Sequence, residues 1–208
     1  MVNFKDCTLH KLEKMFRVEQ VHGLAALEDW LTGRAEIAAA ERHIVGFFQT
    51  HLTASGYDWN ETELAYNFIG PLMGLADFVT KRFNFFAERP FGGIVEGIEM
   101  SGKPDGMIAS GFREPEQPFF CFQEYKKQKD PEGDPAGQAL AAMLVAHELN
   151  ERRHAVYGAY IIGADWCFMA LQGKQYAISP AYVATRDDVF EIFRILKVLK
   201  QIILELLP

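Results

Sequence analysis

Three charged residues in the second half of the sequence have types and spacings that suit phosphate chemistry. Asp105 begins one predicted strand, and Glu124 and Lys126 lie two residues apart on the next. Residues two apart point to the same face of a strand, and neighbouring strands bring their ends close together. Two carboxylates offer the hard oxygen ligands that Mg²⁺ or Mn²⁺ prefers, and a lysine beside them can orient water or stabilise a phosphate. The pattern therefore indicates metal-dependent phosphodiester hydrolysis, with Asp105 and Glu124 as metal ligands and Lys126 as the assisting cation.

The elements that must position these residues follow from hydrophobic spacing and turn residues. Strands are predicted over residues 91–100, 104–111, 119–127, 156–163, 166–172 and 175–179. Helices are predicted over residues 21–31, 36–52, 138–153 and 187–207, with another that begins after Asn60. This order predicts the α/β (α+β) class, with one mixed central sheet flanked by helices. The strand over 119–127 is apolar at its start and charged at Glu124, as a strand is when it leaves a core and enters a cleft.

Pro104-Asp105, followed further along by Glu124-Tyr125-Lys126, resembles the PD-(D/E)xK motif of the restriction-endonuclease-like nuclease superfamily. Among its branches the chain is most similar to the N-terminal nuclease domain of type I restriction R subunits. The predicted order over residues 60–163 is also similar to that fold: a helix, three strands, a helix and a further strand. The resemblance covers about residues 60–205 and implies a restriction-endonuclease-like fold, a Mg²⁺ (or Mn²⁺) cofactor and a DNA substrate.

The resemblance also implies supporting roles for two further residues. Some branches carry an acidic residue on the first helix, which corresponds to Glu63, and several carry a Gln on the helix after the motif, which corresponds to Gln138. Ala142 stands where the recombination exonucleases have a Tyr, so the chain departs from that branch.

Simpler interpretations of these residues stay open at the level of sequence. Pro104-Asp105-Gly106 is typical of a turn, and Glu124 and Lys126 would also suit an exposed strand end. Glu63 lies three residues after Asn60, which is the spacing of a capping box. Gln138 would also suit the surface of the first turn of its helix.

Composition restricts the function classes and the compartment. The chain has 208 residues, of which 49% are apolar, and this is enough for a sizeable core. With 21 Lys and Arg against 28 Asp and Glu, the net charge is −7, so bulk electrostatic attraction to nucleic acid is excluded. No apolar run is long enough for a membrane span, and residues 1–16 lack the apolar centre of a signal peptide. Three scattered cysteines form no disulfide framework, so we expect a cytoplasmic protein.

The predicted organisation is a helical N-terminal extension over residues 1–56 and a nuclease-like core over residues 57–208, as one compact unit. The final helix has more apolar residues than one buried face needs, which predicts either burial on two sides or a subunit contact. We expect a homodimer, and a protein partner could bind through the N-terminal helices or this C-terminal helix. The expected function is a metal-dependent nuclease acting on DNA. The alternative is a non-catalytic nucleic-acid-binding or assembly subunit on the same scaffold, which need not bind metal.

Overall fold

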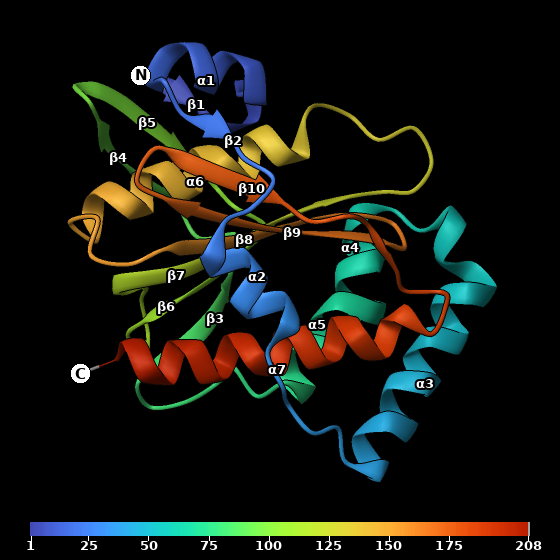
Figure 1. Cartoon of the computed structure of the whole chain (residues 1–208). Helices are drawn as coiled ribbons and strands as arrows, with labels where there is room; N and C mark the ends of the chain where they lie inside the picture. The colour runs from blue at the N-terminus through green and yellow to red at the C-terminus, as the bar shows by residue number, and fades with distance from the viewer. Residues whose placement is uncertain (208) are drawn as a thin grey trace.

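A computed structural model describes residues 1–207, and its centre is an eight-stranded mixed sheet flanked by helices (Figure 1). In sheet order the strands are β2 (Glu19–Gln20), β10 (Gln175–Ile178), β9 (Asp165–Gln172), β8 (Val156–Ile162), β7 (Glu116–Lys126), β6 (Gly106–Ser110) and β3 (Phe83–Ala87), while β11 (Tyr182–Val183) pairs with β9. β3, β6 and β7 are antiparallel neighbours, whereas β7 and β8 run parallel. The predicted class, a mixed sheet with helices on its faces, is confirmed.

A second, smaller sheet has the order β1 (Val2–Asn3), β5 (Ile98–Gly102) and β4 (Phe91–Val95). It lies beside α6 (Pro135–Leu149), the helix that connects β7 to β8 (Figure 1). The short 3₁₀ helix η1 (Phe4–Asp6) and α1 (Leu9–Phe16) also pack against α6. α6 is therefore enclosed between two sheets, and this explains why its sequence is apolar and small on every side.

The opposite face of the large sheet is covered by α2 (Ala25–Thr32) and by the long C-terminal helix α7 (Asp188–Leu206), as Figure 1 shows. The remaining helical segments follow one another beside α7: α3 (Ala39–Ser55), η2 (Gly56–Asp58), α4 (Glu61–Leu64), the π-helical turn η3 (Ala65–Ile69) and α5 (Gly70–Leu75). The π-helical turn immediately precedes Gly70-Pro71, because proline lacks the N–H that a regular helix would use at that position.

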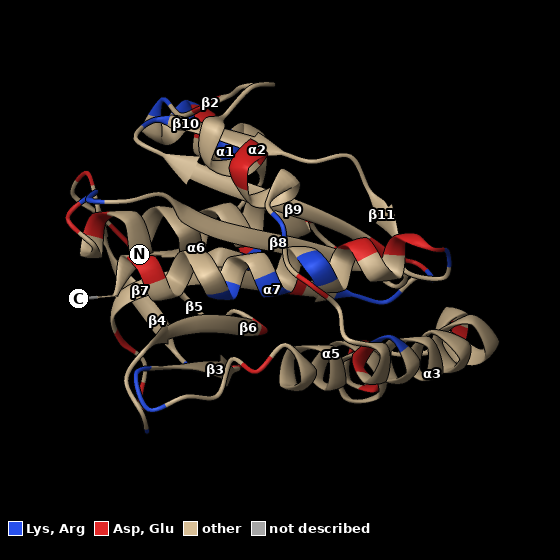
Figure 2. Cartoon of the chain, turned by 60° about the horizontal axis from the view of Figure 1, so that its bottom comes forward, with Lys and Arg blue, Asp and Glu red and all other residues tan. Residues whose placement is uncertain are grey.

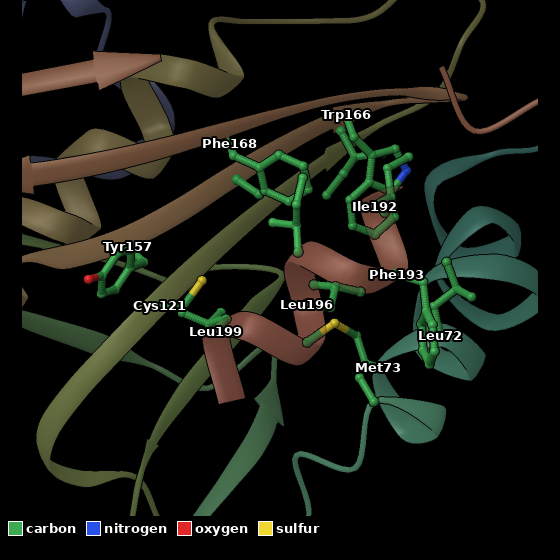
Figure 3. Close-up of a cluster of buried hydrophobic side chains, with 14 of the residues drawn as sticks. Leu72, Met73, Cys121, Tyr157, Trp166, Phe168, Ile192, Phe193, Leu196 and Leu199 are labelled. Atoms are coloured by element: carbon green, nitrogen blue, oxygen red, sulfur yellow. The ribbon is translucent and has the colours of Figure 1, made fainter. Parts of the chain in front are cut away.

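Most of the apolar surface of α7 is covered within the chain, with Leu204 near its end exposed. Figure 3 shows Phe193 and Leu196 of α7 close to Leu72 and Met73 of α5, and Phe168 of β9 in the same cluster. Along α7, eight residues from Val189 to Ile203 are buried. The helix is thus buried on two sides, which is the first of the two alternatives that its sequence left open. The homodimer stays a prediction, without support from this helix.

The N-terminal segment is helical in part, but it also contributes strands to both sheets. β1 pairs with β5 in the small sheet, and β2 pairs with β10 at the edge of the large one. The indole of Trp30 in α2 is fully buried, packs edge-on against Tyr157 and Phe168, and donates a hydrogen bond to the Ile195 carbonyl at 2.9 Å. Residues 1–56 are therefore an integral part of the folded unit.

The prediction of a single strand over residues 91–100 is wrong, because the chain turns back within this segment. Residues 91–102 form a hairpin, β4 and β5, whose turn at Glu96-Gly97 has positive φ at both residues, as a type I′ turn requires. The partner of β6 in the large sheet is instead β3, which the sequence analysis did not predict. Of the three antiparallel neighbours β3, β6 and β7, the first therefore lies earlier in the chain than the strand predicted over residues 91–100.

Within residues 1–207, no helix is long and apolar enough to cross a membrane. The three cysteines are free and buried, in agreement with the absence of a disulfide pattern in the sequence.

Candidate functional site

The end of the large sheet brings Asp105, Glu124 and Lys126 together. The Tyr125 backbone N–H donates a hydrogen bond to Asp105 Oδ2 at 2.6 Å, which fixes this carboxylate beside β7. Lys126 Nζ donates to Glu124 Oε1 at 2.8 Å, and the two side chains form a buried ion pair. The sequence-predicted meeting of these three residues at the ends of adjacent strands is therefore present.

The pairing of β6 with β7 produces this arrangement. Gly106 lies opposite Gln123, so Asp105, one residue earlier, lies next to Glu124. A Cβ atom at Gly106 would stand 2.7 Å from the Phe85 ring and 2.8 Å from Tyr125 Oη, so only glycine fits directly after Asp105. Charged residues are scarce along the strands and lie mainly at their ends (Figure 2), and in β7 they are Glu116 at the start and Glu124 and Lys126 at the end.

The two carboxylates are held in an environment that disfavours their charge. Burial raises the pKa of Asp105 from 3.8 to about 6, although the Tyr125 N–H and the Lys126 charge oppose the shift. Burial and the neighbouring Asp105 charge raise the pKa of Glu124 from 4.5 to about 7. Burial alone would lower the pKa of Lys126, but its hydrogen bond to Glu124 and the nearby carboxylates raise it overall. The site thus contains a protonated lysine beside two carboxyl groups that compete for charge.

A further carboxylate reaches the site from α4, and it is Glu61. Its Oε1 lies 3.8 Å from Lys126 Nζ. Glu63 instead forms the capping box: its Oε2 accepts from the Asn60 N–H at 2.8 Å, and its own N–H donates to Asn60 Oδ1 at 2.9 Å. Of the two interpretations of Glu63, the structure shows the cap. Glu61 lies in the same first turn of α4 as Glu63. Because the two residues are two positions apart, their side chains lie on different sides of the helix.

Gln138 lies in the first turn of α6, is buried, and lines the same pocket as Glu124 and Lys126. This pocket has a volume of about 760 Å³ and lies on the α6 side of the sheet end. The loop before α6 packs closely on Gln138, since a Cβ at Gly133 would come within 2.6 Å of its amide nitrogen. Gln138 therefore lies in the pocket that Glu124 and Lys126 line, and its supporting role stays a prediction from the resemblance.

Asp105 lines a second pocket of about 400 Å³, together with Glu61, Glu88, Tyr66 and Tyr125. The Tyr66 ring is 77% exposed, on the π-helical turn. Two pockets therefore meet at the sheet end: Asp105 and Glu61 line one, Glu124 and Lys126 line the other, and Glu61 Oε1 still lies 3.8 Å from Lys126 Nζ.

The donors at this sheet end fit a magnesium-type ion. Within residues 1–207, no group of three or more His, Cys, Asp or Glu side chains is placed to hold a metal ion. Mg²⁺, however, is commonly bound through one or two carboxylates, with water and substrate phosphate completing its shell. Asp105 and Glu124 supply two such carboxylates on adjacent strands, close enough for the Asp105 charge to raise the pKa of Glu124, and each lines one of the two adjoining pockets.

No protein-family model and no curated protein sequence matches this chain.

Proposed function

We propose that this protein is a metal-dependent nuclease that hydrolyses phosphodiester bonds, with DNA as its substrate and a restriction-endonuclease-like core. The observation that carries the proposal is the group formed by half-buried Asp105 and the buried pair Glu124 and Lys126, at the ends of two adjacent strands and beside two adjoining pockets. Carboxyl groups in a cleft with strongly shifted pKa values and a specific charge partner are typical of functional sites. Burying such groups costs free energy, so they are seldom kept for folding alone.

The strand order supports the restriction-endonuclease-like part of the proposal. A helical segment, α4 to α5, precedes β3, β6 and β7, which form an antiparallel meander. α6 then leads to β8, which runs parallel to β7. Apart from the β4–β5 hairpin, which is inserted between β3 and β6, this is the helix, three strands, helix and strand order that the resemblance implies, with β3 in the place of the strand first assigned to residues 91–100.

Each residue then has a separate task. Asp105 and Glu124 would hold Mg²⁺ or Mn²⁺, which supplies charge neutralisation at the phosphate and lowers the pKa of bound water. The Tyr125 N–H keeps Asp105 oriented, and the pairing with Glu124 keeps Lys126 within the site. The Lys126 ammonium can donate hydrogen bonds to the attacking water or to a phosphate oxygen, where negative charge develops. Gln138 offers an amide to the same pocket.

The experiment is a cleavage assay on fluorescent single-stranded DNA, duplex DNA and RNA, with Mg²⁺ or Mn²⁺ and with EDTA. We expect metal-dependent cleavage by the wild-type protein. Removal of one charge-stabilising group commonly lowers turnover by about 10²- to 10³-fold, so Lys126→Ala should lose activity on this scale. Lys127→Ala, the next residue on the chain but outside both pockets, is the matched control and should retain activity.

The absence of metal-dependent cleavage on all three substrates would contradict the proposal. Equal cleavage by the wild type and Lys126→Ala would contradict it as well, because the activity would then come from another site. The absence of both metal binding and cleavage would favour the non-catalytic subunit that the sequence left as the alternative.

A further inference from the structure

We propose that the pocket on the α6 side of the sheet end binds backbone phosphates of a nucleic-acid strand, next to the phosphate that reacts, through Lys5 and Lys103. This inference rests on the proposed nuclease function and adds a route for the substrate. It also assigns a role to β1 and to the β4–β5 hairpin, which lie outside the strand order of the proposed nuclease core.

The charge of this pocket is opposite to that of the whole protein. The net charge of the chain is −7. The pocket is nevertheless lined by three lysines, Lys5, Lys103 and Lys126, and by a single carboxylate, Glu124, which is already paired with Lys126. Asn3, Ser101 and Gln138 add polar side chains to the same lining. A concave surface on which one sign of charge predominates attracts ligands of the opposite sign, so this pocket favours an anion.

The backbone that carries Lys5 is held firmly against the small sheet. Val2 and Asn3 pair with Met100 and Ser101 of β5, and the Asn3 side chain accepts a hydrogen bond from the Lys5 N–H at 3.1 Å. The neighbouring Phe4 ring is buried against Gly102, where a Cβ would come within 2.5 Å of the ring. The position of Lys5 at the pocket is therefore set by the fold, although its side chain is exposed.

Lys103 is connected directly to the candidate centre. It follows β5 and precedes Pro104 and Asp105, so the chain passes from the small sheet to the metal-binding carboxylate within two residues. Its side chain is exposed at the pocket that Glu124 and Lys126 also line. A phosphate bound by Lys103 would thus lie beside the reacting group and could belong to the same strand.

Both ammonium groups are available for a ligand. Among the ion pairs of residues 1–207, Lys126 appears twice, but neither Lys5 nor Lys103 appears. An exposed lysine is a mobile point charge on a flexible stem, which suits successive phosphates of a flexible backbone. Binding would therefore not require an existing ion pair to break.

The second pocket provides the contrast. Its charged lining residues are Glu61, Glu88 and Asp105, and it contains no basic side chain. Phosphates are repelled by this side and attracted by the other. The strand is therefore expected to lie on the α6 side of the sheet end, where Lys5 and Lys103 converge.

The test is the salt dependence of oligonucleotide binding. The probe is a fluorescein-labelled single-stranded DNA of roughly 20 nucleotides, measured by anisotropy with Ca²⁺ in place of Mg²⁺ at about 50 to about 200 mM NaCl. Each phosphate contact contributes about 0.7 to the slope of log K against log salt for a single strand. The double variant Lys5→Gln/Lys103→Gln should therefore have a slope smaller by about 1.4 than the wild type.

The matched control is Lys14→Gln/Lys81→Gln, which removes the same charge from two exposed lysines outside the pocket. It should leave the slope close to that of the wild type. An equal loss of slope in both double variants would overturn the proposal, because the effect would then be one of net charge. An unchanged slope in Lys5→Gln/Lys103→Gln would also overturn it.

The outcome for this pocket can be separated from the outcome for the nuclease. If the wild type cleaves DNA and the pocket variant keeps its salt slope, the phosphate site is wrong and the nuclease stands. If the pocket variant loses slope but the wild type does not cleave, the phosphate site stands and the nuclease fails. If the wild type does not bind the probe, the phosphate site is overturned.

Discussion

Replacing Asp105 by Asn is expected to stabilise the metal-free protein at alkaline pH while it removes a proposed metal ligand. The Asn side chain keeps an oxygen that can accept the hydrogen bond from the Tyr125 N–H, which is 2.6 Å long in the wild type. The Asn side chain cannot ionise, so the variant does not carry the free-energy cost of a partly buried negative charge in the folded state. A side chain kept for function rather than for folding should behave in this way.

The sign and the size follow from the pKa of Asp105, which burial raises from 3.8 to about 6. Between these two values the folded protein binds more protons than the unfolded chain, so stability is lost as the pH rises and stays lost above about pH 6. A shift of one pKa unit corresponds to about 1.4 kcal/mol, so the full effect is at most about 3 kcal/mol. Because Asp105 is partly exposed, we expect about 1–3 kcal/mol at about pH 8.

The assay is urea unfolding in EDTA at about pH 4.5 and about pH 8, for the wild type and Asp105→Asn. The stabilisation should be clearly larger at the higher pH, because the carboxyl group is largely protonated in the folded protein at the lower one. Asp130→Asn, a change at an exposed aspartate in the loop after β7, is the control and should show little difference. A variant Asp105→Asn that is less stable than the wild type at about pH 8, or equally stable at both pH values, would refute the reasoning.

Three further predictions concern the elements that position the site. Asn60→Ala should lower the free energy of unfolding by about 1 kcal/mol, since it removes the cap of α4, and urea unfolding measures this; an unchanged midpoint would speak against the cap. Trp30→Ala should cost about 3–5 kcal/mol in the same assay, because it empties a buried site and removes the bond to Ile195; a small loss would mean that residues 1–56 are weakly attached. The Cys121 thiol should react with a thiol reagent only after unfolding, because burial raises its pKa and blocks access; rapid reaction in the native protein would contradict the structure.

The class of the fold could be predicted because most elements carry local signals. The capping box at Asn60 and the apolar spacing of α7 lie in short stretches of sequence, so their positions could be predicted directly. β3 was missed because its short aromatic run has no distinctive turn residue before it. The β4–β5 hairpin was read as one strand because its turn has Glu96 where such turns usually have Asn, Asp or Gly.

The candidate site was predictable where residues share a strand or lie at the ends of neighbouring strands. Glu124 and Lys126 needed only the two-residue period of β7, and Asp105 needed the pairing of β6 with β7. Glu61 could not be found in this way, because its approach to Lys126 depends on how α4 packs over the sheet end. The lysines of the α6-side pocket were equally hidden, since Lys5 reaches it only through the pairing of β1 with β5.

The most direct test of the central claim is Mn²⁺ binding measured by calorimetry on the wild type and on Asp105→Ala. If Asp105 and Glu124 form a metal site, the wild type should bind Mn²⁺ and the variant should lose this binding while remaining folded. Thermal unfolding of the variant in EDTA verifies that it is folded. No binding by the wild type, or equal binding by a folded Asp105→Ala variant, would contradict the account.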